Sequence, residues 1–549
     1  MDRCRFHTDR NLAALRRRRF FVNHLDDIGR IPVAGIARYS HFDWVLHPRF
    51  RGRVRARIPL HTTTGLKPME AEKIIAQLES ILASEHVHTD DKTRKLFAED
   101  LIFSGPPPLA VIAPATRDEV RDSVRACTKA GVALLPRGGG LSYTAGYVQS
   151  EEDAVPAVVL DTRRLDRVLE VNADNMTVTV EAGCTCETMM AATAEYGLRA
   201  TMFGPTTGRY STIGGSLSNN CMFFGSAKAG TSADAVLGLE VVSADGKVVV
   251  TGSGAIKNSV PFFRNNGPDL TGLFLNDAGA VGIKVAATLR LEKIPKGQAA
   301  SSFTFGSFDT LIHAIRAIGQ SGLASECLGV GPAPLGDEAV SDPTLHVMCE
   351  GWTQEIADAH LAAIFEIVGT DGTAGEPVVP NFIRDNPFSF VQSPLDAKGR
   401  MQIWTHGVFP LGRVTDAYDG FMTVLKDQFA DMAALDIEAS LSFACAGSAM
   451  MVEPVLYWHG QAKNLHHTGM TPVEDRAPED NDAARRDACV RSIRGAFASM
   501  MDDLGAAHMQ YGRFYSYASA TNDETVALLR NVKRAVDPEN LINPGVLGL

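Results

Sequence analysis

The hydrophobic pattern of the chain becomes regular at Met69 and predicts a helix from there to about Glu85. Apolar residues recur in this segment at intervals of three and four positions, which places them on one face of a helix. These residues are Ile74, Ile75, Leu78, Ile81 and Leu82. We therefore expect an amphipathic helix that packs on a core.

A β-α-β unit follows this helix. The apolar runs Leu109–Ile112 and Val132–Leu135 predict two buried strands. Between them, Thr116 and Glu119 have the spacing of a capping box, which indicates the start of a helix. The second strand leads directly into a glycine-rich turn, residues 136–146.

Strands and helices then mix without strict alternation. Strands are predicted at residues 157–160, 168–171 and 176–180, a helix at about 186–196, and a hairpin at 237–242 with an Asp245-Gly246 turn. A doubly wound parallel sheet requires regular alternation of strands and helices. The pattern therefore favours the α+β class.

Glycine clusters become rare after about Pro295, and amphipathic segments take over. Here we predict helices at 356–368, 415–429 and 483–504, strands at 401–408 and 452–458, and a polar connector at 474–482. This change of composition predicts a domain boundary near residue 295.

Composition agrees with a multi-domain enzyme. The chain has 549 residues, 45% hydrophobic and 21% charged, which predicts two to four folding units. No apolar run approaches the ~18–20 residues of a membrane-spanning helix. The nine cysteines are scattered and odd in number, as in a protein with reduced thiols, so we expect a cytoplasmic location.

The N-terminal part of the chain has a different charge from the rest. Up to Ile58 there are 14 arginines, no lysine and five aspartates, a net charge of +9 in a chain whose total is −11. We expect residues 1–68 to form a disordered, basic extension. Nucleic-acid binding is the alternative that such arginine clusters suggest, and we do not expect it.

Three glycine-rich stretches indicate a bound dinucleotide. They occupy residues 136–146, 203–220 and 267–283. Successive backbone N–H groups of such turns form a concave site for anions such as pyrophosphate. The sequence has no GxxxxGK[ST] motif and no helix-opening GxGxxG followed by an acidic residue, so ATP and NAD are disfavoured.

These stretches and the end of the chain resemble the FAD-linked oxidases of the vanillyl-alcohol oxidase and p-cresol methylhydroxylase type. The resemblance lies in residues 136–146, 212–220 with 237–242, 267–283 and 537–545, in that order. It implies a two-lobed FAD-binding domain at 69–295, an α+β cap (substrate) domain at 296–482, and a C-terminal segment, 483–549, that returns to the FAD domain. The residues that it places at FAD are Pro136, Arg137, Gly138, Gly139, Gly140, Leu141, Ser142, Pro205, Thr212, Gly214, Gly215, Ser218, Asn219, Gly230, Thr231, Gly282 and Ile283.

The resemblance also bears on how FAD is held. Family members attach it through a histidine of the first glycine turn, where this chain has Leu141, or through a cysteine before the second, where it has Gly204. We therefore expect non-covalent FAD. Attachment through a cap histidine or tyrosine stays open.

Within the family, the sequence is most similar to the D-lactate dehydrogenase and glycolate oxidase branch. It lacks that branch's H-V-G-D-G-N motif and has Asp277–Gly282 in place of S-E-G-T-L-G. The resemblance implies oxidation of a small alcohol, foremost a 2-hydroxy acid, by hydride transfer to flavin N5. Two alternatives are an oxidase or dehydrogenase of 4-substituted phenols and an electron-transfer flavoprotein subunit. The electron acceptor (oxygen, a quinone or a cytochrome) and a homodimeric state stay open.

Candidate catalytic side chains lie near the end of the chain. His508 is the candidate base and Arg513 the candidate group for a carboxylate or phenolate, while Tyr511 and Tyr515 orient the substrate. If this segment is a strand, His508 and Arg513 lie on opposite faces unless the chain bends at Gly512.

A second cluster of polar residues lies in the predicted cap. It consists of Glu453, Tyr457, His459, His466 and His467. Zinc is an alternative for this cluster, but the spacing matches no familiar ligand set, so we predict no metal. His406 is a further, isolated candidate.

Overall fold

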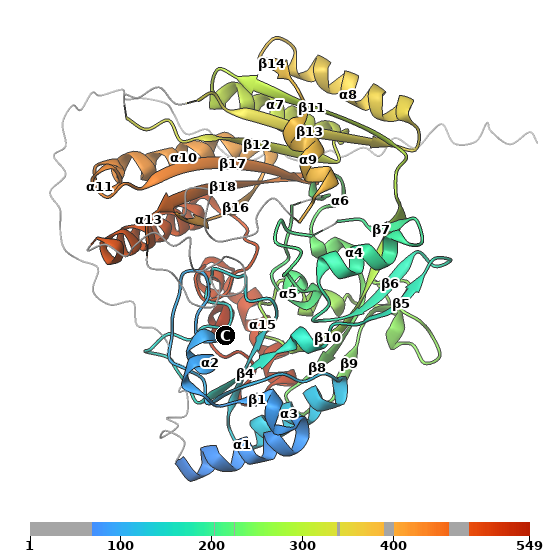
Figure 1. The fold of residues 1–549 in the computed structure, drawn as a ribbon, viewed down its shortest axis with the longest axis vertical. Coiled ribbons are helices and arrows are strands. Elements are labelled where there is room, and N and C mark those ends of the chain that lie inside the picture. The colour runs from blue at the N-terminus through green and yellow to red at the C-terminus, as the bar shows by residue number, and fades with distance from the viewer. Residues whose placement is uncertain (1–67, 203, 224, 337–340, 389–399, 461–481) are drawn as a thin grey trace, which may run out of the picture. The chain divides into compact units, whose positions relative to one another are not determined.

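The computed structural model describes residues 68–549 except 203, 224, 337–340, 389–399 and 461–481. Apart from Pro68, the predicted basic extension lies outside these residues. So does the predicted connector 474–482, apart from Asp482. In the described part, the secondary structure forms three sheets with helices packed on them, which confirms the α+β class (Figure 1).

The first sheet carries the first glycine-rich turn. Its strand order is β1 (Val87–His88), β2 (Ala110–Ile112), β4 (Ala157–Asp161) and β3 (Ala133–Arg137). The last three strands run parallel. Helices α1 (Pro68–Leu82) and α3 (Arg117–Lys129) pack against each other. The Thr116 hydroxyl caps α3 by accepting from the N–H of Glu119 at 3.2 Å, as the sequence predicts.

The second sheet is antiparallel and corresponds to the other lobe that the resemblance implies. Its order is β5 (Val168–Asn172), β6 (Thr177–Glu181), β10 (Ile283–Lys293), β8 (Val236–Val242) and β9 (Val248–Val250), and β7 (Leu198–Ala200) pairs with β10. Helices α4 (Cys186–Ala194) and α5 (Ile213–Ser218) follow β6 and β7 along the chain. The β8–β9 pair is the predicted hairpin.

The third sheet belongs to the cap. Its order is β14 (Gly372–Gly375), β11 (Gly297–Phe305), β13 (Thr344–Gly351), β12 (Glu326–Pro332), β17 (Glu438–Ala446), β18 (Ala449–Trp458) and β15 (Met401–Trp404), and β16 (Gly407–Pro410) pairs with β18. Figure 1 shows the cap helices α7 (Phe308–Ser321), α8 (Gln354–Val368), α10 (Val414–Asp427) and α13 (Ala483–Leu504) around this sheet. Their apolar faces form a core with alternate residues of the strands, such as Phe443 and Val452.

Two predicted elements of the cap are wrong in detail. The single strand expected at 401–408 is two strands, β15 and β16, because the chain leaves the sheet at Thr405 and His406, which are fully buried. The helix expected at 415–429 ends at Asp427, and a separate short helix, α11 (Phe429–Ala434), follows.

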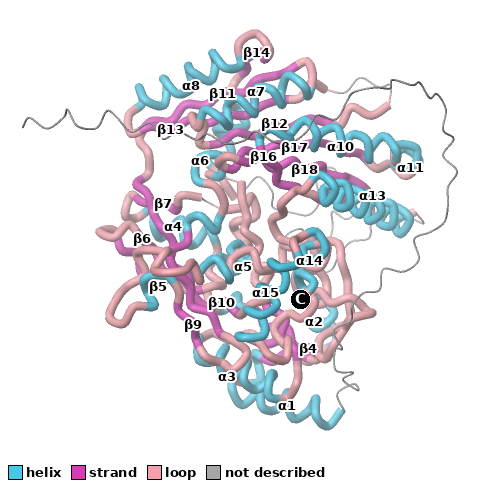
Figure 2. The backbone as a smooth tube through the Cα atoms, turned by 180° about the vertical axis from the view of Figure 1, so that it is seen from behind, coloured by secondary structure: helices cyan, strands magenta, loops and turns pink. Residues whose placement is uncertain are grey.

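The last helix and the C-terminus lie against the two lobes of the FAD-binding fold. Figure 2 shows α15 (Asp523–Val536) beside β10, and its apolar residues pack on the core of the second sheet. The chain then pairs with β3: the N–H of Leu134 donates to the carbonyl of Leu541, and the N–H of Asn543 to that of Leu134. None of the described helices has the length and hydrophobicity needed to cross a bilayer.

Candidate FAD and substrate site

A cavity of about 1060 Å³ lies between the glycine-rich stretches and the cap sheet. Fifteen of the seventeen residues that the sequence assigns to FAD line it. The two exceptions are Gly230 and Thr231. Thr231 instead caps the short helix Ser232–Ala235, where its N–H and hydroxyl both donate to Asp234. FAD contacts themselves stay a prediction.

The first glycine turn offers donors to an anion. Among the described residues, the N–H groups of Gly139, Gly140 and Leu141 have no hydrogen-bond acceptor. A side chain at Gly138 or Gly139 would collide with the second glycine-rich stretch, at Thr212 and Tyr210 respectively. The two stretches approach closely because both positions are glycine.

Arg137 adds positive charge to this turn. Its guanidinium donates to the carbonyl of Gly138 at 3.1 Å and lies over the ring of Phe97, 4.5 Å from its centroid. Free N–H donors next to a buried cation suit a pyrophosphate, whose charge requires both. The residues of the turn therefore fit the phosphate part of FAD.

Asp100 holds the far end of the same turn. Its carboxylate accepts from the N–H groups of Ile102, Phe103 and Ala145 at 2.6–2.8 Å. Burial raises the pKa of Asp100 to about 6, against the effect of these three donors. Asp100 thus ties the turn to the loop before β2.

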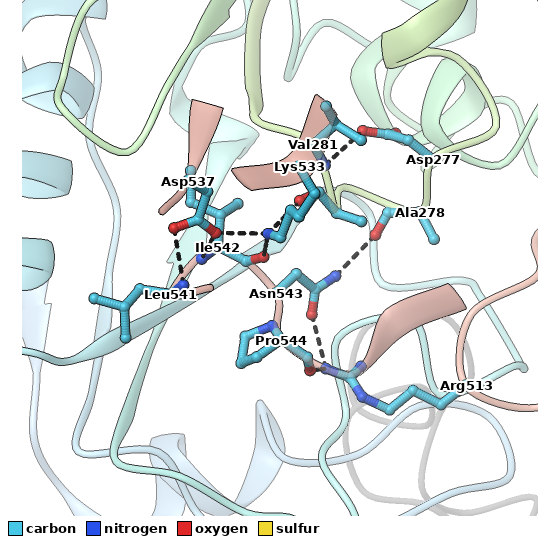
Figure 3. Close-up of polar contacts among 11 residues, drawn as sticks. Asp277, Ala278, Val281, Arg513, Lys533, Asp537, Leu541, Ile542, Asn543 and Pro544 are labelled. Carbon is cyan, nitrogen blue, oxygen red and sulfur yellow. Dashed lines mark hydrogen bonds and ion pairs between the residues drawn. The ribbon is translucent and has the colours of Figure 1, made fainter. Parts of the chain in front are cut away.

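The C-terminal segment joins the first and third glycine-rich stretches (Figure 3). The side-chain amide of Asn543 donates to the carbonyls of Gly146 and Ala278, both at 2.8 Å. Nearby, the buried ammonium of Lys533 donates at 2.6 Å to Asp537 and to the carbonyls of Ala280 and Ile542. These contacts fix the spacing of the stretches that line the cavity.

The opposite side of the cavity is formed by alternate residues of five cap strands, which we call the cap wall. They are Leu328 and Val330 from β12, His346 from β13, Gln402 and Trp404 from β15, Ser440 and Ser442 from β17, and Met451, Glu453, Val455 and Tyr457 from β18. Because side chains alternate along a strand, residues two apart face the same way. The intervening residues pack against the cap helices.

Glu453 is a carboxyl group on this wall. It pairs in register with Ser442, whose hydroxyl donates to the Glu453 carboxylate at 3.3 Å. Glu453 is 6% exposed, and burial raises its pKa to about 8. A carboxyl group with a pKa near neutrality is suited to accept a proton during a reaction.

Two family models match most of the parts that form this cavity. The model of the FAD binding domain matches residues 108–252, and that of the C-terminal domain of FAD linked oxidases matches residues 403–547. The chain belongs to the FAD-linked oxidases. It is an FAD-dependent oxidoreductase.

Curated relatives of this FAD-linked oxidase are similar over most of their length. D-2-hydroxyglutarate dehydrogenase of Xanthomonas citri pv. viticola is 26% identical over 80% of this chain and 89% of that protein. D-lactate dehydrogenase [cytochrome] 1 of Saccharomyces cerevisiae is 22% identical over 87% of this chain and 80% of that protein.

Solved structures show the same fold. The 4-ethylphenol oxidase of Gulosibacter chungangensis superimposes with a TM-score of 0.68 at 17% identity, covering 88% of this chain and 98% of that chain. p-Cresol methylhydroxylase gives the same values. This confirms the two-lobed FAD-binding fold with an α+β cap.

The predicted catalytic residues His508, Tyr511, Arg513 and Tyr515 lie close to the cavity but not on its lining, which includes their neighbours Met509 and Gln510. Their segment is irregular and not a strand, with positive φ at Gln510 and Gly512. The strand alternation considered for it therefore does not apply. Their catalytic roles stay predictions.

The contacts of Arg513 favour a role in the fold. Its guanidinium donates to the carbonyls of Ala145, Gly146 and Pro544 and to the side-chain oxygen of Asn543, at 2.8–3.1 Å. Burial lowers the pKa of Arg513 to about 10. Both of its terminal nitrogens are therefore engaged by protein oxygens and not directed to a substrate anion.

His508 and His406 form a buried pair behind Met509. The ring of His508 stacks on Tyr515 with centroids 3.9 Å apart, and its Nδ1 lies 3.0 Å from the carbonyl of His406. The Nε2 of His406 lies 2.9 Å from the carbonyl of Met509. A nitrogen facing a carbonyl must carry the proton. Burial lowers the pKa of both rings, to about 3 for His406.

The polar cap cluster is only partly described. Tyr457 lies on the cap wall with Glu453, whereas His466 and His467 lie outside the described residues. In the part that the structure describes, no group of three His, Cys, Asp or Glu side chains is arranged to hold a metal ion. The sequence pointed to Glu453 as part of this cluster but gave no sign that it faces the cavity.

Proposed function

We propose that this FAD-linked oxidase oxidises the CH–OH carbon of a small 2-hydroxy acid to a 2-oxo acid. The observation that carries the proposal is the buried carboxyl group of Glu453, which faces the cavity and has a pKa of about 8. The relatives named for D-2-hydroxyglutarate and D-lactate support the substrate class. FAD, when bound, accepts the hydride from the substrate carbon.

The cap wall supplies the other requirements of this reaction. The Glu453 carboxylate takes the hydroxyl proton of the substrate, and the hydroxyl groups of Ser440 and Ser442 donate to the substrate carboxylate. The Ser442 hydroxyl lies 3.2 Å from the carbonyl and 3.3 Å from the carboxylate of Glu453, and its single proton turns from these acceptors to the substrate carboxylate when the substrate binds. These donors are neutral, and among the described residues the arginine and lysine of the cavity lining lie on its glycine-rich side: Arg137 in the first glycine turn, and Lys284, which pairs with Asp277 at 2.6 Å.

The same lining favours a second candidate, the oxidation of a 4-substituted phenol or another neutral alcohol. A neutral substrate requires no cation, and much of the cap wall is apolar. In this reading, Glu453 performs the same proton transfer. The two candidates differ in the charge that the substrate brings next to Glu453.

Anaerobic reduction of the bound flavin tests the proposal. D- and L-2-hydroxy acids and 4-substituted phenols are added to the holoenzyme, and the loss of flavin absorbance is followed. We expect bleaching by one enantiomeric series of hydroxy acids. Bleaching by phenols alone identifies the second candidate, and no bleaching without an added protein partner indicates an electron-transfer subunit.

The pH dependence separates the two substrate classes further. In kcat/KM, which reports the free enzyme, we expect the rate to rise with pH through about 8 as Glu453 ionises. The pH dependence of kcat reports the pKa of Glu453 in the enzyme–substrate complex. There, a substrate carboxylate next to Glu453 opposes its ionisation and shifts the rise in kcat to higher pH. A neutral alcohol produces no such shift. Glu453→Gln is expected to lower kcat by about a hundredfold or more and to abolish the rise of the rate with pH.

A further inference from the structure

One part of the cavity lining next to Glu453 is apolar. It combines residues of the cap wall with residues from the FAD-binding side and from α9 (Val378–Asp385). They are Met222, Leu328, Val330, Val379, Met451 and Met509. Together with their neighbours they form a hydrophobic cluster that spans the cap and the FAD-binding side.

Strand register places this apolar part directly beside the proposed proton acceptor. Met451 precedes Glu453 by two residues on β18, so the two side chains share a face about 7 Å apart along the strand. Val330 pairs with Ser442, which bonds Glu453. Leu328 lies in the next row, where it pairs with Ala444, the partner of Met451. The apolar surface therefore begins two residues from Glu453 along β18 and extends across β17 to β12.

The far end of this surface is uncharged. His346 pairs with Leu328 there, and burial lowers the pKa of His346 to about 4, which leaves the ring neutral at pH 7. Its Nδ1 lies 2.9 Å from the hydroxyl of Ser302. Arg137 and Lys284 belong to the glycine-rich side of the cavity. A second carboxylate of a substrate would thus meet apolar side chains and no cation among the described residues of this end.

We infer that the preferred substrate carries an apolar side chain of several carbons on its carbinol carbon, and that this chain lies along Met451, Val330 and Leu328. The inference rests on the proposed function and specifies its substrate class: a 2-hydroxy acid with an aliphatic chain rather than lactate or a dicarboxylate. Methionine side chains adapt to different shapes. The site therefore accepts chains of different length.

A small second cavity marks the end of the subsite. It has a volume of about 20 Å³ and shares Phe223, Leu328 and His346 with the main cavity. The rest of its lining is apolar except for Glu326, whose pKa is raised by burial, which favours the uncharged form. This volume is on the order of that needed for one water molecule. A substrate chain that reaches this cavity can bury no more than about one further methylene group there.

A chain-length series tests the inference. kcat/KM of the holoenzyme is measured by flavin bleaching with 2-hydroxy acids whose linear side chains grow from methyl to octyl, and with a 2-hydroxy dicarboxylate of intermediate length. We expect a rise of up to about fourfold per added methylene, which corresponds to about 0.8 kcal/mol for each methylene removed from water, followed by a plateau. The dicarboxylate should react at least tenfold more slowly than the monocarboxylate of equal length.

The outcomes separate this inference from the proposed function. If no hydroxy acid bleaches the flavin, the proposed function itself fails. If hydroxy acids bleach it but the series is flat or falls from lactate onward, or if the dicarboxylate reacts best, the proposed function stands and the apolar subsite is wrong.

Variants of the subsite provide a second measurement. Met451→Gln keeps the length of the side chain but makes it polar, so it should lower kcat/KM for the hexyl substrate about tenfold more than for lactate. Met69→Gln makes the same exchange on the surface of α1, where the methionine is 62% exposed, and should leave the chain-length dependence unchanged. An equal effect of Met451→Gln on all chain lengths, at full FAD content, contradicts the placement of the chain along β18.

Discussion

The guanidinium of Arg513 donates to the side-chain oxygen of Asn543 at 2.9 Å. This bond fixes the orientation of the Asn543 amide, because the oxygen faces Arg513 and the nitrogen faces the carbonyls of Gly146 and Ala278. Arg513 also donates to the carbonyl of Gly146. The two residues therefore hold the end of the first glycine turn against the third glycine-rich stretch.

We expect Arg513→Lys to weaken the FAD-binding fold rather than the binding of an anionic substrate. A lysine cannot make the forked contacts of the guanidinium, and hydrogen bonds to charged groups contribute about 1.5–3 kcal/mol each. The free energy of unfolding should fall by about this amount, and turnover of anionic and neutral substrates should fall together. Urea unfolding, FAD content and kcat/KM for both substrate types check this. A selective loss with anionic substrates, at unchanged stability, would restore the role in substrate binding that the sequence suggests.

Asp100→Asn is expected to weaken FAD binding about tenfold. The asparagine side chain has one acceptor oxygen in place of two, so the N–H of Ala145 at the end of the glycine turn faces an NH₂ group. A buried donor without an acceptor costs about 1–3 kcal/mol. Titration of the apoprotein with FAD measures the effect. Asp91→Asn, an exposed position on α2 (Asp91–Leu96), is the matched control and should bind FAD as the parent does.

Lys533→Met should destabilise the protein by about 3–5 kcal/mol, because it leaves the buried Asp537 carboxylate without its cation. The double variant Lys533→Met with Asp537→Leu removes both charges and should recover a large part of this loss. Denaturant unfolding of Lys533→Met, Asp537→Leu and the double variant gives the coupling free energy. Additive losses in the double variant would show that the ion pair is not the reason for the effect.

Glu453 also makes stability depend on pH. Its pKa is raised from 4.5 to about 8 in the folded state, so between these values the unfolded chain loses a proton that the folded protein keeps. The free energy of unfolding therefore falls as pH rises from 4.5 to 8. Glu453→Gln removes this contribution, and we expect the variant to gain stability relative to the parent between pH 5 and pH 8.

Urea unfolding at both pH values measures that gain. The control is Glu366→Gln, an exchange at an exposed position on α8, for which the difference from the parent should be the same at both. If the free energy of unfolding of Glu453→Gln differs from that of the parent by the same amount at pH 5 and pH 8, the carboxyl group of Glu453 ionises normally in the folded protein.

Acid precipitation should release FAD into the supernatant. The positions that carry covalent links in related oxidases are Leu141 and Gly204 here, and neither a leucine side chain nor a glycine, which has no side chain, can form such a bond. Absorbance of the supernatant and of the pellet measures the distribution. Flavin that stays with the pellet would indicate a link from the cap.

Local sequence predicts much of the secondary structure in both the FAD-binding part and the cap. The capping residue Thr116, the β8–β9 hairpin and the helix 483–504 form where the sequence predicts them, because each depends on interactions between residues close in the chain. The glycine turn at 136–146 could also be recognised, since close backbone approach and left-handed conformations require glycine at fixed positions.

The cap was less predictable, because its strands pair over long distances. The break at Thr405 and His406 has no local signal: both residues leave the sheet to pack in the core beside Tyr143 and Arg494. Likewise, nothing near Arg513 in the sequence indicates that its partners include residues 145, 146 and 544.

The sequence by itself therefore determined the class of cofactor and the fold that holds it, because its glycine-rich stretches are local features and their order resembles that of the FAD-linked oxidases. Only the tertiary structure decided which side chains of the cap face the cavity. Glu453 and Ser442 meet across the β17–β18 hairpin, and Val330 joins them through the register of β12, which lies far earlier in the chain. The hairpin turn fixes the register of β17 against β18, but no local pattern fixes that of β12 against β17, where a shift of one residue would turn the β12 side chains to the other face of the sheet.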